Sequence, residues 1–147
     1  MKLTTRITVE EFLRLPEEPG KRFELDEGKL AAKPSLTFRQ SFIRQQIAEH
    51  LRDFVKKHRL GEITLGTDFR LGPKTVRNPD IAFVTTQHLK SIDIDVSPAP
   101  GAPALAIEIV SPEHLLEDLM ARIACPVGFS GEIFTITLDS NPDTFSG

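Results

Sequence analysis

The chain has 147 residues and a formal net charge of −3, from 18 Lys and Arg against 21 Asp and Glu. This length fits one domain with an adequate core, and we expect residues 1–147 to form a single domain. A hydrophobic fraction of 39% with 27% charged residues excludes a disordered chain. Cys125 is the only cysteine, so an intrachain disulfide and a Cys-rich zinc site are excluded.

Targeting signals are absent from the printed sequence. No apolar run is long enough to span a membrane, and Met1–Arg6 lacks the apolar core of a signal peptide. We therefore expect a cytoplasmic protein without a membrane partner. The net charge neither indicates nor excludes nucleic-acid binding, because a local basic surface can coexist with an acidic total.

The N-terminal part of the chain predicts a short helix followed by a hairpin. Thr8 and Glu11 have the spacing of a capping box, so a helix should begin there and end near Pro16. Residues 22–32 predict two strands around a three-residue loop, 26–28, in which Gly28 supplies a positive φ.

A long helix is predicted from about Thr37 to Arg59, with Gly61 as its C-cap signal. Its expected apolar face consists of Phe38, Phe42, Ile47, Leu51, Phe54 and Val55. The opposite face carries Arg39, Arg44, Arg52 and Lys56. Solvation is the favoured interpretation of that basic face, and contact with phosphates is the alternative.

Strands alternate with short connections in the second half of the chain. Strands are expected at 62–65, 68–71, 80–84, 105–110 and 132–138, with one helical turn at 86–89 and a helix beginning at Ser111-Pro112. The order of elements predicts a mixed α/β or α+β domain, with a central sheet flanked by helices.

Two of these apolar strands each carry one carboxylate, Asp80 at the start of the first and Glu108 inside the second. A buried carboxylate is costly to keep ionised unless it is paired, hydrogen-bonded or bound to a metal. If the strands are neighbours, the two acids can converge on one hard cation such as Mg²⁺. Glu24, in the hairpin, is a third acid that could hold a second ion or orient water.

Each acid also has a purely structural interpretation. Asp80 could cap the start of its strand, Glu108 could pair with an Arg of the long helix, and Glu24 could pair with Arg22 or Lys29 across the hairpin. Spacing alone favours the structural role for Glu24 and leaves both roles open for Asp80 and Glu108.

The Pro79-Asp80 pair, followed by a strand that contains Glu108, resembles the core of the PD-(D/E)XK nucleases. Further segments are similar to one bacterial branch, the Uma-two family of restriction-endonuclease-like proteins, and the likeness covers about residues 6–123. The similar segments are 8–12, 22–25, 28–30, 60–62, 76–84 and 106–112. The order and spacing of these segments together carry the resemblance.

The resemblance implies a restriction-endonuclease-like fold and a phosphodiesterase that depends on Mg²⁺, with Mn²⁺ as the alternative. Asp80 and Glu108 would be the metal ligands, helped by the backbone carbonyl of Ile109, and Glu24 would match an early acidic position. The expected substrate is nucleic acid, with DNA favoured over RNA.

The lysine of the wider nuclease group lies two residues after the Glu, where this chain has Val110. The Uma-two branch is thought to place that lysine on the following helix, and the matching residue here is Arg122. An arginine keeps the positive charge and can stabilise a phosphorane-like transition state, but it does not act as a general base. The alternative for Arg122 is a surface pair with Asp118, four positions earlier.

Residues 124–147 depart from the family pattern, because Pro126 and Gly128 interrupt the expected helix. One explanation is a reading-frame shift near residue 123, which predicts an atypical or truncated C-terminal part. Two alternatives to a nuclease follow. The chain could be a catalytically impaired relative that binds nucleic acid, or a self-associating domain that forms a homodimer through an open sheet edge.

Overall fold

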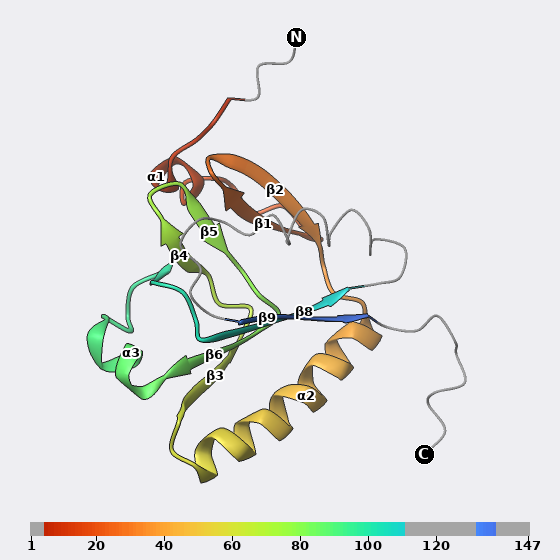
Figure 1. Cartoon of the computed structure of the whole chain (residues 1–147). Coiled ribbons are helices and arrows are strands. Elements are labelled where there is room, and N and C mark those ends of the chain that lie inside the picture. The colour runs from red at the N-terminus through yellow and green to blue at the C-terminus, as the bar shows by residue number, and fades with distance from the viewer. Residues whose placement is uncertain (1–4, 111–131, 138–147) are drawn as a thin grey trace.

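A computed structural model of the whole chain describes residues 5–110 and 132–137 (Figure 1). The helices are α1 (Val9–Phe12), α2 (Phe38–Lys57) and α3 (Thr86–Ser91). The strands are β1 (Lys21–Asp26), β2 (Lys29–Pro34), β3 (Gly61–Leu65), β4 (Phe69–Gly72), β5 (Thr75–Arg77), β6 (Ile81–Thr85), β7 (Ala99–Pro100), β8 (Leu105–Val110) and β9 (Glu132–Thr137). They form two mixed sheets, in the orders β2-β1-β5-β4-β7 and β3-β6-β8-β9.

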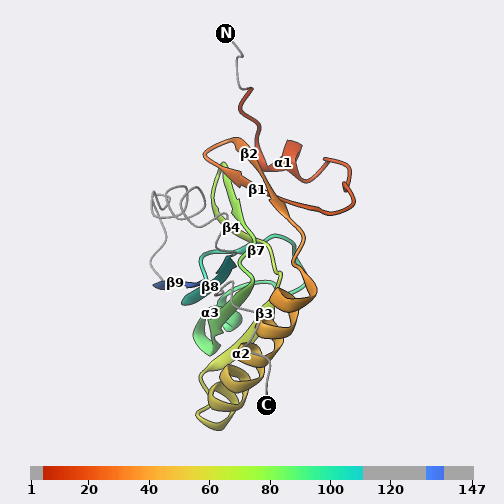
Figure 2. The same cartoon turned by 90° about the vertical axis from the view of Figure 1, so that its right-hand side faces the viewer.

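The mixed α and β composition is therefore confirmed, but the strands divide between two sheets where one central sheet was expected. The hairpin and α1 lie at one end of the molecule, and α2 lies at the other, along the second sheet (Figure 2). In the part of the chain that the structure describes, no helix combines the length and apolar character needed to cross a membrane.

Helix α1 is a single turn that covers the apolar side of the hairpin. The predicted capping box is present, since Thr8 Oγ1 accepts a hydrogen bond from the Glu11 N–H and the Glu11 carboxylate accepts one from the Thr8 N–H. The helix ends at Phe12, earlier than expected. Its buried residues pack against Leu25 of β1 and Val76 of β5, and this contact fixes the hairpin to the rest of its sheet.

The hairpin turn is shorter than the sequence suggested. Asp26 pairs with Lys29, so only Glu27 and Gly28 form the turn, with φ values of 48° and 83°. Two consecutive left-handed residues are typical of the two-residue turns that match the twist of paired strands. The Cβ of any larger residue at Gly28 would lie 3.0 Å from the Arg6 Cβ, so glycine also fits the space.

The two strands of the hairpin have one apolar face and one charged face. Because side chains alternate along a strand, Phe23 and Leu25 lie on the α1 side. The other face carries Arg22, Glu24 and Asp26 from β1 with Lys29 and Lys33 from β2, which we call the charged face of the hairpin. Arg22 and Lys33 are direct partners in the register. Like charges in such positions repel, so this face requires acids from elsewhere in the chain.

Helix α2 begins and ends within two residues of the prediction, with Thr37 as N-cap and His58 as C-cap. Gly61 is not its C-cap, because the residue with positive φ after the helix is Arg59, at 54°. Gly61 instead opens β3, where a Cβ would lie only 2.0 Å from the Val84 carbonyl oxygen. Glycine is needed there for the close approach of two strands.

Only part of the expected apolar face of α2 meets the sheet. Ala48 and Val55 are buried with Ile63, Ile81 and Ile107, while Ile47 and Leu51 pack beside them. The side chains of Phe38 and Phe54 are 87% and 57% exposed, so the helix is rotated away from the face that the sequence predicted. The covered side of α2 supports the strands that carry the two candidate acids.

The second sheet brings β6 and β8 together as antiparallel neighbours. Strand β9 pairs in parallel with β8 over its whole length, from Glu132 opposite Leu105 to Thr137 opposite Val110. The strand predicted at 132–138 is therefore confirmed, and the edge of β8 is covered. The helix expected from Ser111 lies outside the described residues.

Two short strands were not predicted. Strands β5 and β7 have three and two residues, too few for a period to show in the sequence. The helical turn expected at 86–89 is confirmed as α3, which Thr85 caps by accepting a hydrogen bond from the His88 N–H. Strand β5 leads directly into Asn78-Pro79-Asp80 and so connects the two sheets at the candidate site.

Candidate active site

Asp80 and Glu108 are brought together by the register of β6 and β8. Ile81 pairs with Ile107 and Ala82 with Ala106, and one step further along this register Asp80 stands opposite Glu108. Directly opposite residues of an antiparallel pair lie on the same face, with Cβ atoms about 5 Å apart. Both acids are buried, with 1% and 7% of their surface exposed. This register, continued by one residue, therefore predicts that the two desolvated carboxylates lie side by side.

Asp80 is held in its ionised form. Its Oδ2 accepts a hydrogen bond of 2.7 Å from the Ile109 N–H, and its Oδ1 forms an ion pair of 2.9 Å with Arg22. Burial by itself raises the pKa of Asp80, but the Ile109 hydrogen bond and the positive charges of Lys33 and Arg22 outweigh it, so the pKa is lowered. Asp80 is consequently an anion at neutral pH despite its burial.

Lys33 connects the other two acids. Its Nζ lies 3.3 Å from Oε1 of Glu24 and 3.2 Å from Oε2 of Glu108, and it donates to the Asn78 carbonyl at 3.1 Å. Glu24 is 3% exposed and also accepts hydrogen bonds from the Asn78 N–H, at 2.9 Å, and from Arg77, at 3.3 Å. Three buried acids and three cations, Arg22, Lys33 and Arg77, thus form one charge cluster between the two sheets, and Arg77 also forms an ion pair of 3.2 Å with Asp26.

The three acids of the site were predicted from the sequence, but the three cations were not. Arg22 or Lys29 was the structural partner expected for Glu24, and the ion pairs of Glu24 instead join it to Lys33 and Arg77. Arg22 pairs with Asp80. The signal that could have found them is the alternation of the hairpin, which places Arg22 and Lys33 on the same face as Glu24.

The roles predicted for Arg122 and Ile109 are not tested by the structure. Val110 occupies the position of the expected lysine, and its side chain is 3% exposed. Arg122, the proposed replacement for that lysine, lies outside the described residues, so its role stays a prediction. Ile109 contacts Asp80 through its N–H, and its role as a metal ligand through its carbonyl stays a prediction too.

Asp68 and Asn78 form a polar pair beside the cluster. Asn78 Nδ2 donates to Asp68 Oδ1 at 2.7 Å and to the Gly66 carbonyl at 2.9 Å. Burial raises the pKa of Asp68, the Asn78 hydrogen bond opposes this, and the negative charge of Glu24 adds to the rise. The backbone of Asn78 therefore contacts the charge cluster, and its side chain contacts a further acid, Asp68.

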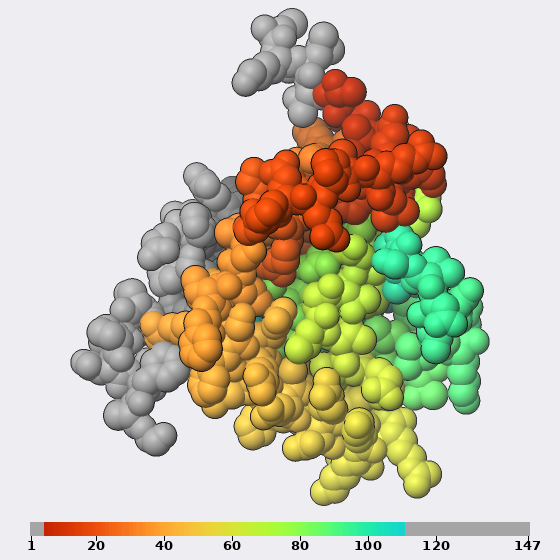
Figure 3. All heavy atoms as spheres, turned by 180° about the vertical axis from the view of Figure 1, so that it is seen from behind, coloured from red at the N-terminus to blue at the C-terminus, as the bar shows by residue number. Residues whose placement is uncertain are grey.

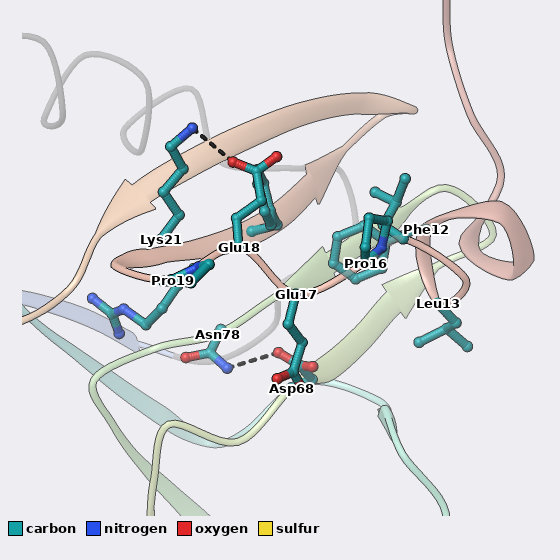
Figure 4. Close-up of a pocket in the computed structure, with 12 residues that line it drawn as sticks. Phe12, Leu13, Pro16, Glu17, Glu18, Pro19, Lys21, Asp68 and Asn78 are labelled. Atoms are coloured by element: carbon teal, nitrogen blue, oxygen red, sulfur yellow. Dashed lines mark hydrogen bonds and ion pairs between the residues drawn. The ribbon is translucent and has the colours of Figure 1, made fainter.

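A cavity of about 520 Å³ opens next to this pair (Figure 4). Its apolar wall comes from the α1–β1 connection, which lies above β3 and β4 on the face shown in Figure 3. Its polar lining includes Arg22, Asp68 and Asn78, so the cavity shares Arg22 with the charge cluster. The apolar lining consists of Phe12, Leu13, Leu15, Pro16, Pro19 and Phe23.

The donor set fits one hard divalent cation. Mg²⁺ is bound in proteins by one or two carboxylates together with waters, and each carboxylate offers about four lone-pair positions. The contacts given above use two of those positions on Asp80 and at least two on Glu108. Among residues 5–110 and 132–137, however, no three His, Cys, Asp or Glu side chains converge as a group that could hold a metal.

Comparison with known proteins identifies relatives of the chain. The model of the Uma2 family, described as "Putative restriction endonuclease", matches residues 9–124. A solved structure from Anabaena variabilis ATCC 29413, titled a putative nuclease belonging to DUF820, is similar to the chain with a TM-score of 0.72 and 24% sequence identity. The match covers 89% of this chain and 74% of that one. No curated protein matches the chain.

Proposed function

Because the chain belongs to the Uma2 family of putative restriction endonucleases, we propose that it is a nuclease that hydrolyses phosphodiester bonds with a divalent metal ion. Mg²⁺ is the expected ion and Mn²⁺ the alternative, and DNA is the substrate favoured over RNA. The observation that supports the proposal is the pair of buried acids, Asp80 and Glu108, which directly precede and follow the paired residues Ile81 and Ile107.

Asp80 and Glu108 would hold the metal ion between them. Asp80 is suited to this role because its lowered pKa keeps it ionised without a metal. Ile109 donates its N–H toward Asp80, and in a strand the N–H and C=O of one residue face the same neighbour. The carbonyl of Ile109 therefore also faces β6, and it could supply a third oxygen ligand to an ion held by Asp80 and Glu108. A bound ion would polarise the phosphoryl oxygen and lower the pKa of a coordinated water.

The remaining residues of the cluster would position these ligands. Arg22 fixes one oxygen of Asp80, and Lys33 contacts both oxygens of Glu108. Partners that orient metal ligands commonly change metal affinity or activity by about 10–100-fold when they are removed. The cations also reduce the negative charge that an incoming phosphate group would meet.

A plasmid-nicking assay with Mg²⁺ tests the proposal on the full chain. Asp80→Asn and Glu108→Gln keep the shape of each side chain and remove its charge, so each should reduce nicking at least about 100-fold. Asp93→Asn, at an exposed position after α3, is the matched control and should cleave like the wild type. Equal nicking by all four proteins would remove the assignment.

A second candidate function is nucleic-acid binding without cleavage. It is favoured by Val110, an apolar and buried residue where the wider nuclease group has a lysine. Salt-sensitive DNA binding, metal binding and no turnover would together support this alternative. A homodimer also stays a prediction, and light scattering would test it.

A further inference from the structure

Lys33 is a buried ammonium surrounded by oxygens. Its Nζ lies within 3.4 Å of Glu24 Oε1, both carboxylate oxygens of Glu108 and the carbonyl oxygen of Asn78. The side chain is 9% exposed, and those of Glu24 and Glu108 are 4% and 10% exposed. Two carboxylates and one backbone carbonyl are also the oxygen donors that a hard divalent cation selects.

We propose that Lys33 is a positioning residue whose ammonium takes the place of a second divalent ion, between Glu24 and Glu108, and so limits the site to one ion, between Asp80 and Glu108. The inference rests on the proposed function for that first ion.

The contacts of each acid support this division. Asp80 is bound by Arg22 and by the Ile109 N–H, and the ion pairs of Lys33 go to Glu24 and Glu108. Glu24 is also bound by Arg77 and by the Asn78 N–H. Glu108 would thus contact two cations. Lys33 would lie between Glu108 and Glu24, and the metal ion would lie between Glu108 and Asp80.

The backbone around Lys33 fixes its ammonium in this position. Lys33 lies opposite Arg22 in the β1–β2 pair, so it stands on the charged face of the hairpin and not on the face that α1 covers. Pro34 ends the strand directly after it. A fixed monovalent cation differs from a metal ion in that it cannot activate a water molecule, so cleavage at this site would use one metal ion. Sites with two ions hold them about 4 Å apart, and the ammonium excludes that arrangement.

Metal stoichiometry tests the inference without any cleavage assay. Mn²⁺ is titrated into the full-length wild type, Lys33→Met and Lys29→Met, with isothermal calorimetry for the stoichiometry and electron paramagnetic resonance for free Mn²⁺. Lys29→Met is the matched control, because Lys29 lies on the same strand and is exposed. We expect one ion in the wild type, one in Lys29→Met and two in Lys33→Met. Adding Glu24→Gln to Lys33→Met should return the number to one.

A wild type that binds two ions, or a Lys33→Met variant that binds no more ions than the wild type, would overturn the inference. If Lys33→Met is unstable without metal, its melting temperature should rise on addition of Mn²⁺ by more than that of the wild type. If it is unfolded, Mn²⁺ should restore its circular dichroism spectrum. Failure of Mn²⁺ to stabilise or refold it would contradict the inference equally.

The proposed function and this inference fail in different ways. If the wild type binds one ion and Lys33→Met binds two, but the wild type does not cleave DNA, the nuclease assignment fails and the role of Lys33 stands. If the wild type cleaves with Mg²⁺ and Lys33→Met gains no second ion, the role of Lys33 fails and the nuclease assignment stands.

Discussion

The two sheets of the protein are stabilised in different ways where they face the site. The sheet of β3, β6 and β8 lies on α2 through apolar contacts, among them those of Ile63, Ile81 and Ile107. The hairpin sheet meets it through charges, with Arg22 and Lys33 on one side and Asp80 and Glu108 on the other. The sheet on α2 is thus stabilised by burial of apolar surface, and the junction of the two sheets is stabilised by pairing of buried charges. The stability of the junction should therefore depend on pH and on added cations.

The largest expected effect comes from Lys33→Met, because it leaves buried negative charge without its ammonium. Removing one partner of a buried ion pair costs about 3–5 kcal/mol of unfolding free energy. Urea unfolding in the presence of a chelator measures it, with Lys29→Met as the control that should stay within about 0.5 kcal/mol of the wild type. A loss equal to that of the control would contradict the view that the junction of the sheets depends on charge.

Ile81→Ala should destabilise the apolar region by about 2–4 kcal/mol, through lost burial and the cavity that remains. Ile81 is 1% exposed and packs in the cluster with Ala48 and Val55 of α2. The same urea experiment applies, and here Mn²⁺ should not restore more stability than it adds to the wild type. Equal rescue of Ile81→Ala and Lys33→Met by Mn²⁺ would erase the distinction between the two regions.

Acid should weaken the charged region through Asp80. Its folded pKa is lowered, so its contribution to stability is complete above the unfolded pKa of about 3.9 and is lost as the pH falls through the lower folded pKa. We expect the difference in unfolding free energy between wild type and Asp80→Asn to be constant near neutral pH and to shrink below about pH 4. Denaturant titrations across this range measure it, and a difference that does not change with pH would show that Asp80 is not held as an anion.

The smallest effect is expected for Asp68→Asn, and its sign is opposite. The folded pKa of Asp68 is raised by burial and by Glu24, so its ionised form lowers stability above that pKa, and the penalty disappears as the pH falls below the unfolded pKa. The substitution keeps an oxygen that can accept from Asn78 Nδ2. Thermal melts at neutral pH should show a stabilisation of less than about 1 kcal/mol, and a clear loss of stability would contradict it.

The sequence identified the acids of the site because they interrupt apolar strands, which is a local pattern. Asp80 and Glu108 are each recognisable from their immediate neighbours, and the strands that carry them were predicted nearly to the residue. The cations were missed because Lys33 reaches Glu108 across 75 positions, and no local period reports such a contact. The pairing of Arg22 with Lys33 across the hairpin indicates where these cations bind, because two cations on opposite strands repel each other unless acids from another strand lie beside them.

Other differences from the sequence analysis have equally local causes. Gly61 follows a long helix and so predicts a C-cap. In the structure it has another role, because only a residue without a Cβ lets β3 come this close to the Val84 carbonyl of β6. The aromatic residues of α2 follow a helical period, yet Phe38 is 87% exposed. The period shows which residues share one face of a helix, but it does not show whether that face packs against the sheet.

The pairing of Arg22 with Asp80 and of Lys33 with Glu108 joins segments 58 and 75 positions apart. Contacts of such long range form late in folding. On the ribosome the hairpin is complete long before β8 has been synthesised, and until then its two opposed cations have no acids to meet. The newly made chain therefore cannot complete this charge cluster before β8 has emerged, and under the proposed function it would not cleave nucleic acid before that point.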